Sequence, residues 1–161
     1  TGGGSFIQLG IHHADLFRWY LGDVAKVGSF SKTLVAPMEG DDSTVAIIEF
    51  KSKALGVLES SYVERSFQKR IELYGSEGWA TIDNRDGYMT LLSVKRTGKI
   101  ERIPFEKFKN PVKMANPWEH FIDCILNDKD PMVSGEDGKK ALEIVLAAYS
   151  SARENRIIEI G

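Results

Sequence analysis

The sequence predicts an α+β domain with a largely antiparallel, open-faced sheet and helices packed on one face. One helical segment comes first, a run of strand-like segments follows, and two helical segments and a short strand close the chain. Strands and helices grouped in this way are typical of α+β domains. Short polar connections between successive strands favour antiparallel pairing. Because 161 residues fit one domain, we expect residues 1–161 to form a single domain.

The N-terminal segment begins with a glycine loop and continues as a helix. Gly2, Gly3 and Gly4 can adopt backbone angles closed to other residues and let another chain or a ligand approach closely. His12, His13 and Asp15 then open a helical period that ends at Gly22, a residue type that commonly ends helices. The i, i+3, i+4, i+7 spacing predicts one shared face for Gln8, His12, Asp15 and Trp19.

His12 is the first candidate for catalysis on this helix. Its imidazole gains or loses a proton near neutral pH, which suits general acid/base chemistry when the group is held on a rigid helix. The spacing leaves an alternative open, in which His12 or His13 is a half-buried, hydrogen-bonded histidine and Asp15 stabilises the first helical turn.

The middle of the chain predicts strands joined into one antiparallel sheet. Segments rich in β-branched and apolar residues lie between polar turns, at residues 24–35, 43–50, 54–63, 67–74, 79–83, 88–95 and 100–105. Arg65 lies in a polar corner between two of these segments. It is a candidate contact for an acidic or phosphorylated part of a substrate, and the alternative is a solvated turn arginine.

The C-terminal part predicts two helices and an edge strand. Asn116 and Pro117 have the residue types of a helix start, and this helix is expected to end near Asn127. Ser134 and the acids after it predict the N-cap of a longer helix, and a strand closes the chain at 157–160. Strands between residues 43 and 63 offer apolar side chains in both directions. We therefore expect the uncovered sheet face to meet a second subunit.

Composition excludes several classes of partner. The net charge is only -2, from 21 basic and 23 acidic residues spread evenly, so the chain has no electrostatic footprint for nucleic acid or anionic membrane. Its apolar runs are too short to span a bilayer. Cys124 is the one cysteine, which excludes an internal disulfide and agrees with a cytoplasmic location. We expect no metal site.

The segment GGGSFIQLGIHHAD, residues 2–15, resembles the start of the second domain of the glucose-fructose oxidoreductase, inositol dehydrogenase and rhizopine catabolism (Gfo/Idh/MocA) family. The family pattern reads GGG-x-x-x-D-x-G-x-H-x-x-D, and Gln8 replaces its first acid. Further similar segments, in the same order, are residues 71–78, 118–121 and 134–138. The resemblance covers nearly the whole chain and implies a dihydrodipicolinate reductase-like C-terminal domain.

The resemblance implies a part in an NAD(P)-dependent oxidoreductase acting on a sugar, polyol or nucleotide sugar. His12 would bind substrate and transfer the proton, with Gln8, Asp15 and Arg65 as substrate contacts. NAD or NADP would be held by an N-terminal Rossmann domain, since no G-x-G-x-x-G fingerprint occurs in this chain and it starts at Thr1, directly before the glycine loop. The resemblance also implies a homodimer or homotetramer assembled through the sheet.

Gln8 leaves two functional classes open. An amide cannot exchange a proton, although it can donate to and accept from a sugar hydroxyl. The first class is the substrate-binding and oligomerisation domain of an active dehydrogenase, inactive when isolated. The second is a non-catalytic ligand-binding or regulatory module that keeps the fold after losing the acid.

Overall fold

The computed structural model describes residues 3–63, 69–83, 88–93, 97–107 and 116–161. The chain forms two compact units. The first consists of Thr1–Val63 and Phe121–Gly161, and the second of Glu64–His120.

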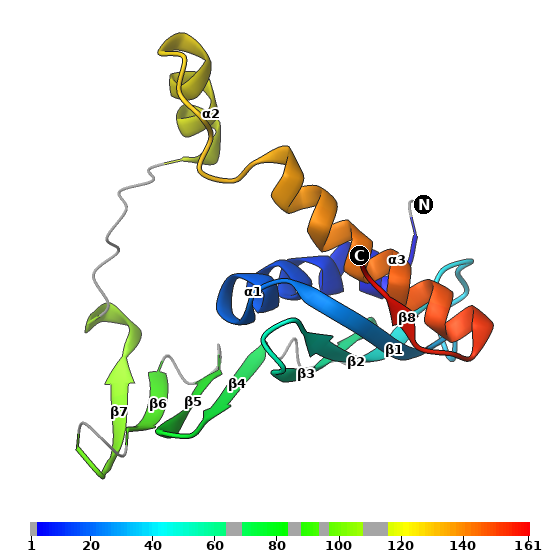
Figure 1. Ribbon diagram of the computed structural model, residues 1–161, viewed down its shortest axis with the longest axis horizontal. Coiled ribbons are helices and arrows are strands. Elements are labelled where there is room, and N and C mark those ends of the chain that lie inside the picture. Colours follow the sequence, from blue (N-terminus) through cyan, green and yellow to red (C-terminus); the bar gives the residue numbers. More distant parts are fainter. Residues whose placement is uncertain (1–2, 64–68, 84–87, 94–96, 108–115) are drawn as a thin grey trace. The chain divides into compact units, whose positions relative to one another are not determined.

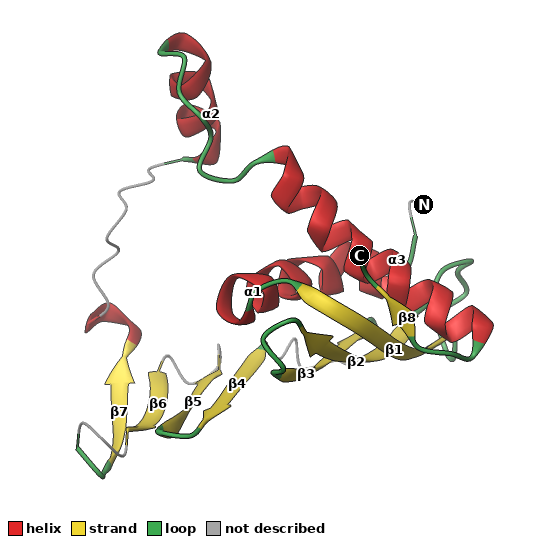
Figure 2. Cartoon of the chain, in the orientation of Figure 1, coloured by secondary structure: helices red, strands yellow, loops and turns green. Residues whose placement is uncertain are grey.

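The first unit is a four-stranded sheet covered by helices on one face (Figures 1 and 2). Neighbouring strands are antiparallel and lie in the order β3-β2-β1-β8. Helices α1 and α3 lie on the same side of this sheet. The elements of this unit are η1 (Phe6–Gly10), α1 (Ile11–Leu21), β1 (Val24–Lys32), β2 (Ser43–Phe50), β3 (Leu55–Ser61), α3 (Gly135–Glu154) and β8 (Ile158–Glu159).

The core lies between this sheet and helices α1 and α3. Strand β2 shows why, because Ala46, Ile48 and Phe50 are buried while the alternate residues Val45 and Ile47 are exposed. Burying such side chains is the main favourable contribution to folding. The largest fully buried apolar side chains are Phe6, Phe50, Ile48, Ile144, Val27 and Val145.

The helix boundaries follow the predicted signals. Ser134 caps α3, because its Oγ accepts from Asp137 N at 3.2 Å while Asp137 Oδ2 accepts from Ser134 N at 2.9 Å. Gly22 follows α1 with φ 87°, a conformation that glycine adopts without steric cost. Helix α2 (Pro117–Leu126) begins at the predicted proline, where Trp118 N donates to Asn116 Oδ1 at 2.9 Å.

The second unit is an antiparallel meander in the order β4-β5-β6-β7. Its elements are β4 (Arg70–Gly75), β5 (Gly78–Asp83), β6 (Tyr88–Ser93), β7 (Ile100–Pro104) and the 3-10 turn η2 (Phe105–Lys107). The expectation of one sheet was therefore wrong for the described strands, which form two sheets. Hairpin signals predict which consecutive strands pair. Whether β3 and β4 belong to the same sheet depends on tertiary structure, which the local alternation of residues does not encode.

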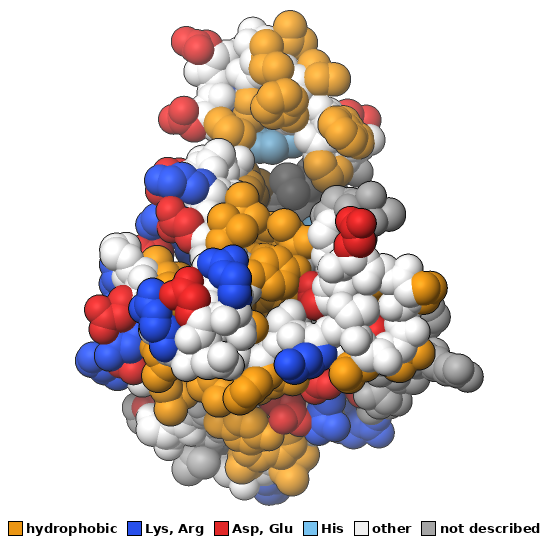
Figure 3. Space-filling model, turned by 90° about the vertical axis from the view of Figure 1, so that its right-hand side faces the viewer, with side chains coloured by type: hydrophobic (Ala, Val, Ile, Leu, Met, Phe, Trp, Pro, Cys, Tyr) orange, Lys and Arg blue, Asp and Glu red, His pale blue; other side chains and the backbone are white. Residues whose placement is uncertain are grey.

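Helix α2 differs from α3 in how its apolar side chains are placed. Trp118, Ile122 and Ile125 recur at helical spacing, yet all three are exposed. Hydrophobic side chains gather over α2 at the top of Figure 3. Among the helices that the structure describes, none is both long and apolar enough to cross a membrane.

Candidate functional site

A π turn at the start of the first helix carries Gln8. The backbone is helical from Ser5 to Leu21, and the Ile11 N–H donates to Phe6 O within η1. Such turns insert one extra residue into a helix and occur frequently at functional sites. Helical periodicity predicted a helix that opens at His12. The structure begins the helix earlier, at Ser5, with this wider turn, of which the spacing gave no sign.

A buried aspartate, Asp41, anchors this helix start. Asp41 Oδ2 accepts from Ser5 Oγ at 2.7 Å, from Phe6 N at 3.1 Å and from Thr44 Oγ1 at 2.9 Å. Its other oxygen accepts from the Tyr149 hydroxyl at 2.6 Å. The Tyr149 oxygen in turn accepts from Ile7 N at 3.1 Å. One carboxylate therefore joins the helix start, strand β2 and helix α3.

The hydrogen bonds of this cluster determine its charge state. Burial would raise the pKa of Asp41, but hydrogen bonds from Tyr149, Ser5, Thr44 and the Phe6 N–H outweigh it and lower that pKa. Burial and the Asp41 carboxylate raise the pKa of Tyr149. Asp41 is therefore ionised and Tyr149 neutral at neutral pH, so the pair supports the helix rather than exchanging protons.

The glycine loop has a structural explanation in this cluster. A Cβ atom on Gly4 would overlap Asp41, and one on Gly40 would lie 2.6 Å from Gly4 N. The Ser5 N–H donates to Asp41 O at 2.7 Å, which completes the close approach. Gly4 thus lets another segment of the same chain approach closely, whereas the glycine pattern had suggested another chain or a ligand.

Gln8 and His12 are exposed above this anchored segment. Gln8 Oε1 accepts from the Tyr62 hydroxyl at 2.6 Å. The His12 imidazole has no hydrogen-bond partner within the described part of the chain. His13 is half-buried instead, and its Nδ1 lies 3.3 Å from Leu9 O. The two neighbouring histidines therefore differ in exposure, with His13 nearer the packed side.

Asp42 supports the other side of the site. Its Oδ2 accepts from Leu34 N at 3.0 Å, Val35 N at 2.7 Å and Ala36 N at 2.8 Å, and its backbone O accepts from Tyr62 N at 2.8 Å. The amide donors of Ala36 and Val35 lower the pKa of Asp42 to about 2. Asp42 thus holds the chain that follows β1 and also positions Tyr62.

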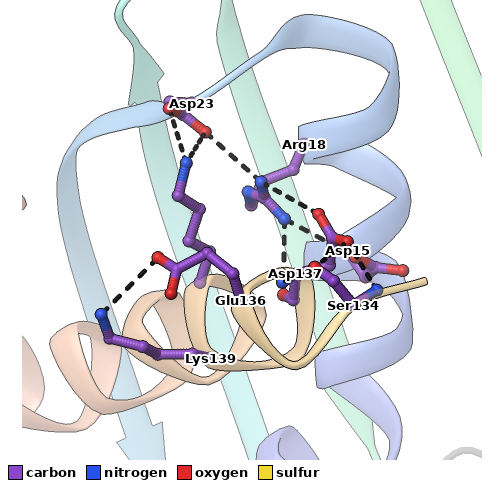
Figure 4. A network of polar contacts seen from close by, with 8 residues as sticks. Asp15, Arg18, Asp23, Ser134, Glu136, Asp137 and Lys139 are labelled. Atoms are coloured by element: carbon purple, nitrogen blue, oxygen red, sulfur yellow. Dashed lines mark hydrogen bonds and ion pairs between the residues drawn. The ribbon is translucent and has the colours of Figure 1, made fainter. Parts of the chain in front are cut away.

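Asp15 lies in a different polar network (Figure 4). Its Oδ1 is 3.8 Å from Arg18 Nη1, and Arg18 also lies 3.4 Å from Asp23 and 3.8 Å from Asp137. Lys140 lies 3.1 Å from Asp23, and its hydrogen bond lowers the pKa of that carboxyl. Ion pairs on this network connect α1 to the start of α3.

A small pocket lies beside the same network. Arg18, Asp23 and Lys140 help to line it, and its volume is about 130 Å³. Sites for small-molecule ligands usually have roughly 300 Å³ or more. In the described ranges, no group of three or more His, Cys, Asp or Glu side chains could hold a metal ion. Arg65 lies outside the described residues.

Sequence reasoning missed Asp41, Tyr149 and Tyr62. Residues 38–42 predict only a polar turn, and the pair Asp41 and Asp42 directly after Gly40 is the one local signal of this cluster. The partners lie far along the chain: 108 residues separate Tyr149 from Asp41, and 54 separate Tyr62 from Gln8. Spacing within one helix cannot reveal such contacts.

Comparison with known proteins identifies the chain's relatives. It is 30% identical to D-apiose dehydrogenase of Paraburkholderia graminis, covering 95% of this chain and 44% of that protein. It is 30% identical to myo-inositol 2-dehydrogenase of Thermotoga maritima, covering 98% and 49%. It is 32% identical to scyllo-inositol 2-dehydrogenase (NAD(+)) of Bacillus subtilis, covering 98% and 48%. The chain spans about half the length of these relatives.

Solved structures share the fold. An oxidoreductase domain protein of Kribbella flavida superposes with a TM-score of 0.83 at 24% identity, covering 100% of this chain and 51% of that one. An aldose-aldose oxidoreductase of Caulobacter crescentus complexed with glycerol superposes with a TM-score of 0.83 at 25% identity, covering 99% and 48%. Residues 1–160 match the family described as "Oxidoreductase family, C-terminal alpha/beta domain". The chain therefore belongs to the Gfo/Idh/MocA oxidoreductase family and corresponds to its C-terminal α/β domain.

Proposed function

We propose that this chain is the substrate-binding and oligomerisation domain of an NAD(P)-dependent dehydrogenase acting on a sugar, polyol or nucleotide sugar. The observation that carries the proposal is the exposed pair Gln8 and His12 on a helix whose start is fixed by Asp41. An N-terminal Rossmann domain would bind the nicotinamide cofactor, which supplies the hydride chemistry. The single cysteine, Cys124, favours a cytoplasmic location.

His12 acts as the general base in sugar oxidation. It takes the hydroxyl proton as hydride leaves the same carbon, and it returns that proton in reduction. The absence of a hydrogen-bond partner for His12 among the described residues leaves both ring nitrogens available. Gln8 orients the ring of the substrate. Asp15, whose side chain is 48% exposed, and Arg65 are further proposed substrate contacts.

A nicotinamide assay of the full-length protein tests this function. The protein is mixed with NAD⁺ or NADP⁺ and with a panel of myo-inositol, scyllo-inositol, D-apiose and nucleotide sugars, and nicotinamide absorbance is recorded. We expect turnover of at least one substrate, and none by chain 1–161 alone. His12→Asn should lower kcat about 10²- to 10⁴-fold, the usual contribution of a general acid/base.

His13→Asn is the matched control for that substitution. It changes the neighbouring histidine in the same way, but on the packed side of the helix. Turnover among folded His13→Asn molecules should stay near the wild-type value. A wild-type protein that binds a sugar without any redox turnover would favour the non-catalytic module, for which Gln8 is the supporting observation.

The outer face of the first sheet supports self-association. Side chains on this face alternate with the buried ones and include five exposed apolar residues on three adjacent strands, which we call the outer apolar face: Phe30, Val45, Ile47, Leu55 and Val57. An exposed apolar surface of this kind marks a protein interface. We propose that two copies of the protein pack through it.

A charge placed in the outer apolar face tests this assembly. We expect the full-length protein to sediment as a dimer or tetramer, and Ile47→Lys to shift it towards monomer because burying an unpaired ammonium is costly. Leu146→Lys is the control, since Leu146 is an exposed leucine on α3, on the opposite side of the sheet. Equal sedimentation of both variants and the wild type would refute assembly through this face.

A further inference from the structure

The orientation of the Gln8 amide follows from its two neighbours. Gln8 Nε2 lies 3.4 Å from Gly3 O, a carbonyl that can only accept. The amide nitrogen must therefore face Gly3, and the amide oxygen faces Tyr62. Because an amide oxygen can only accept, the Tyr62 hydroxyl donates its single proton across the 2.6 Å bond.

This arrangement leaves a defined set of groups for a ligand. Gln8 Nε2 has a second N–H that is not used by Gly3. Tyr62 Oη uses its one proton in the hydrogen bond to Gln8 and keeps lone pairs that can accept a hydrogen bond from a ligand. The pair thus presents a donor and an acceptor side by side. A carboxylate at position 8 would present only acceptors, and it would bring an oxygen towards the Gly3 carbonyl.

The same framework holds both members of the pair. Tyr62 directly follows β3, and its N–H is bound by Asp42 O at 2.8 Å. The end of β3 is joined to the helix start by Ser60 Oγ, which donates to Ser5 O at 3.0 Å. Tyr62 remains 37% exposed, and its hydrogen bond to Gln8 lies at the surface. Adjacent aspartates, Asp41 and Asp42, therefore fix Gln8 and Tyr62 relative to each other.

We propose that Tyr62 is a specificity-determining residue that contacts the substrate together with Gln8. This inference rests on the proposed function and specifies the substrate class. Tyr62 Oη accepts a hydrogen bond from one substrate hydroxyl, while Gln8 Nε2 donates a hydrogen bond to the oxygen on the neighbouring carbon. The pair recognises two neighbouring oxygens of a sugar or polyol, at least one of which carries a proton.

Tyr62→Phe in the full-length protein tests the inference. The assay uses NAD⁺ or NADP⁺ with myo-inositol, scyllo-inositol and D-apiose, and records kcat and KM separately. Loss of one hydrogen bond should lower kcat/KM about 10-fold, mainly through KM, because Tyr62 binds substrate without moving the reacting proton. Tyr74→Phe is the control, since Tyr74 is an exposed tyrosine whose hydroxyl bonds Glu72. It should behave as the wild type.

Monodeoxy derivatives of the substrate that is turned over distinguish contact from mere structural support. If Tyr62 accepts a hydrogen bond from a substrate hydroxyl, the wild type should turn over one monodeoxy derivative with a kcat/KM lowered by the same factor. Tyr62→Phe should turn over that derivative and the parent substrate with equal kcat/KM. A purely structural role would lower turnover of every derivative equally and would overturn the inference. Gln8→Glu is a second variant, expected to raise KM although its oxygen can still bind Tyr62.

These experiments distinguish failure of the inference from failure of the proposed dehydrogenase function. Wild-type turnover with identical kinetics for Tyr62→Phe and Tyr74→Phe overturns the inference and leaves the dehydrogenase function standing. A wild-type protein without turnover on any of these three substrates or on the nucleotide sugars of the wider panel overturns both.

Discussion

The inner and outer sides of segment 3–21 are built differently. On the inner side, Ser5 and Phe6 are fully buried and bonded to Asp41, and Ala14 packs in the core. On the outer side, Gln8 and His12 are exposed. Polar groups on the inner side are hydrogen-bonded to other parts of the same chain, whereas the outer side leaves donors and acceptors for a ligand. Substitutions should therefore affect stability on one side and turnover on the other.

The largest effect on stability is expected for Asp41→Ala. It removes a buried carboxylate and leaves the Tyr149 hydroxyl and the Phe6 N–H without their acceptor. The Ser5 and Thr44 hydroxyls keep a second partner each, Ser60 O and Ser31 Oγ. Unsatisfied buried groups of this kind should lower the free energy of unfolding by about 3 kcal/mol. Urea denaturation measures the loss. Glu39→Ala, an exposed acid in the same loop, is the control and should change little.

Asp41→Asn is a milder substitution at the same position and should have an intermediate effect. An asparagine oxygen can replace Oδ2, which accepts three of the four hydrogen bonds, but its amide cannot accept from Tyr149. Its loss of stability should lie between those of the wild type and Asp41→Ala. Equal stability of Asp41→Ala and the wild type would show that the cluster does not anchor the helix.

A smaller effect is expected for Tyr149→Phe. The ring of Tyr149 keeps its edge contact with Phe6, at a centroid distance of 6.3 Å, so packing is retained. Only the hydroxyl is lost, which leaves Ile7 N without its acceptor and Asp41 with one donor fewer. We expect a loss of about 1–2 kcal/mol in urea denaturation. Tyr88→Phe, at an exposed tyrosine of the second unit, should lose less.

These contacts also show where sequence reasoning succeeds and where it stops. The strands and the capped helix α3 follow from alternation and from capping signals, which act over a few residues. The family was confirmed by the match over residues 1–160. Asp41 and Tyr62 could not be found in this way, because their partners are distant along the chain and depend on tertiary packing.

His13→Asn should have a still smaller effect, on stability alone. The half-buried ring makes one contact of 3.3 Å with Leu9 O, inside the same helix. Asparagine is shorter and loses that contact, so we expect a cost of about 1 kcal/mol or less. Thermal unfolding of His12→Asn in parallel sharpens the comparison, because the exposed ring of His12 should leave Tm unchanged. A larger loss of stability for His12→Asn than for His13→Asn would show that the two histidines lie on the opposite sides of the helix from those described.

The effect with the narrowest pH range is a change in the acid dependence of stability at Asp42. Backbone donors lower its folded pKa to about 2 from an ordinary value of 3.8. Between these two values the unfolded chain binds more protons than the folded chain, so stability rises with pH there and is lost as pH falls from about 4 to 2. Asp42→Asn removes this titration. We therefore expect the free energy of unfolding of the variant to vary less steeply with pH in that window. The difference in slope should correspond to less than one bound proton.

Above about pH 5, both proteins should show parallel curves, because Asp42 is then ionised in both states of the wild type. Urea titrations at half-unit pH intervals measure the two slopes. Identical slopes below pH 4 would mean that the amides of Val35 and Ala36 do not hold the carboxylate in solution, and that the chain after β1 is not fixed beside Tyr62 as the structure shows.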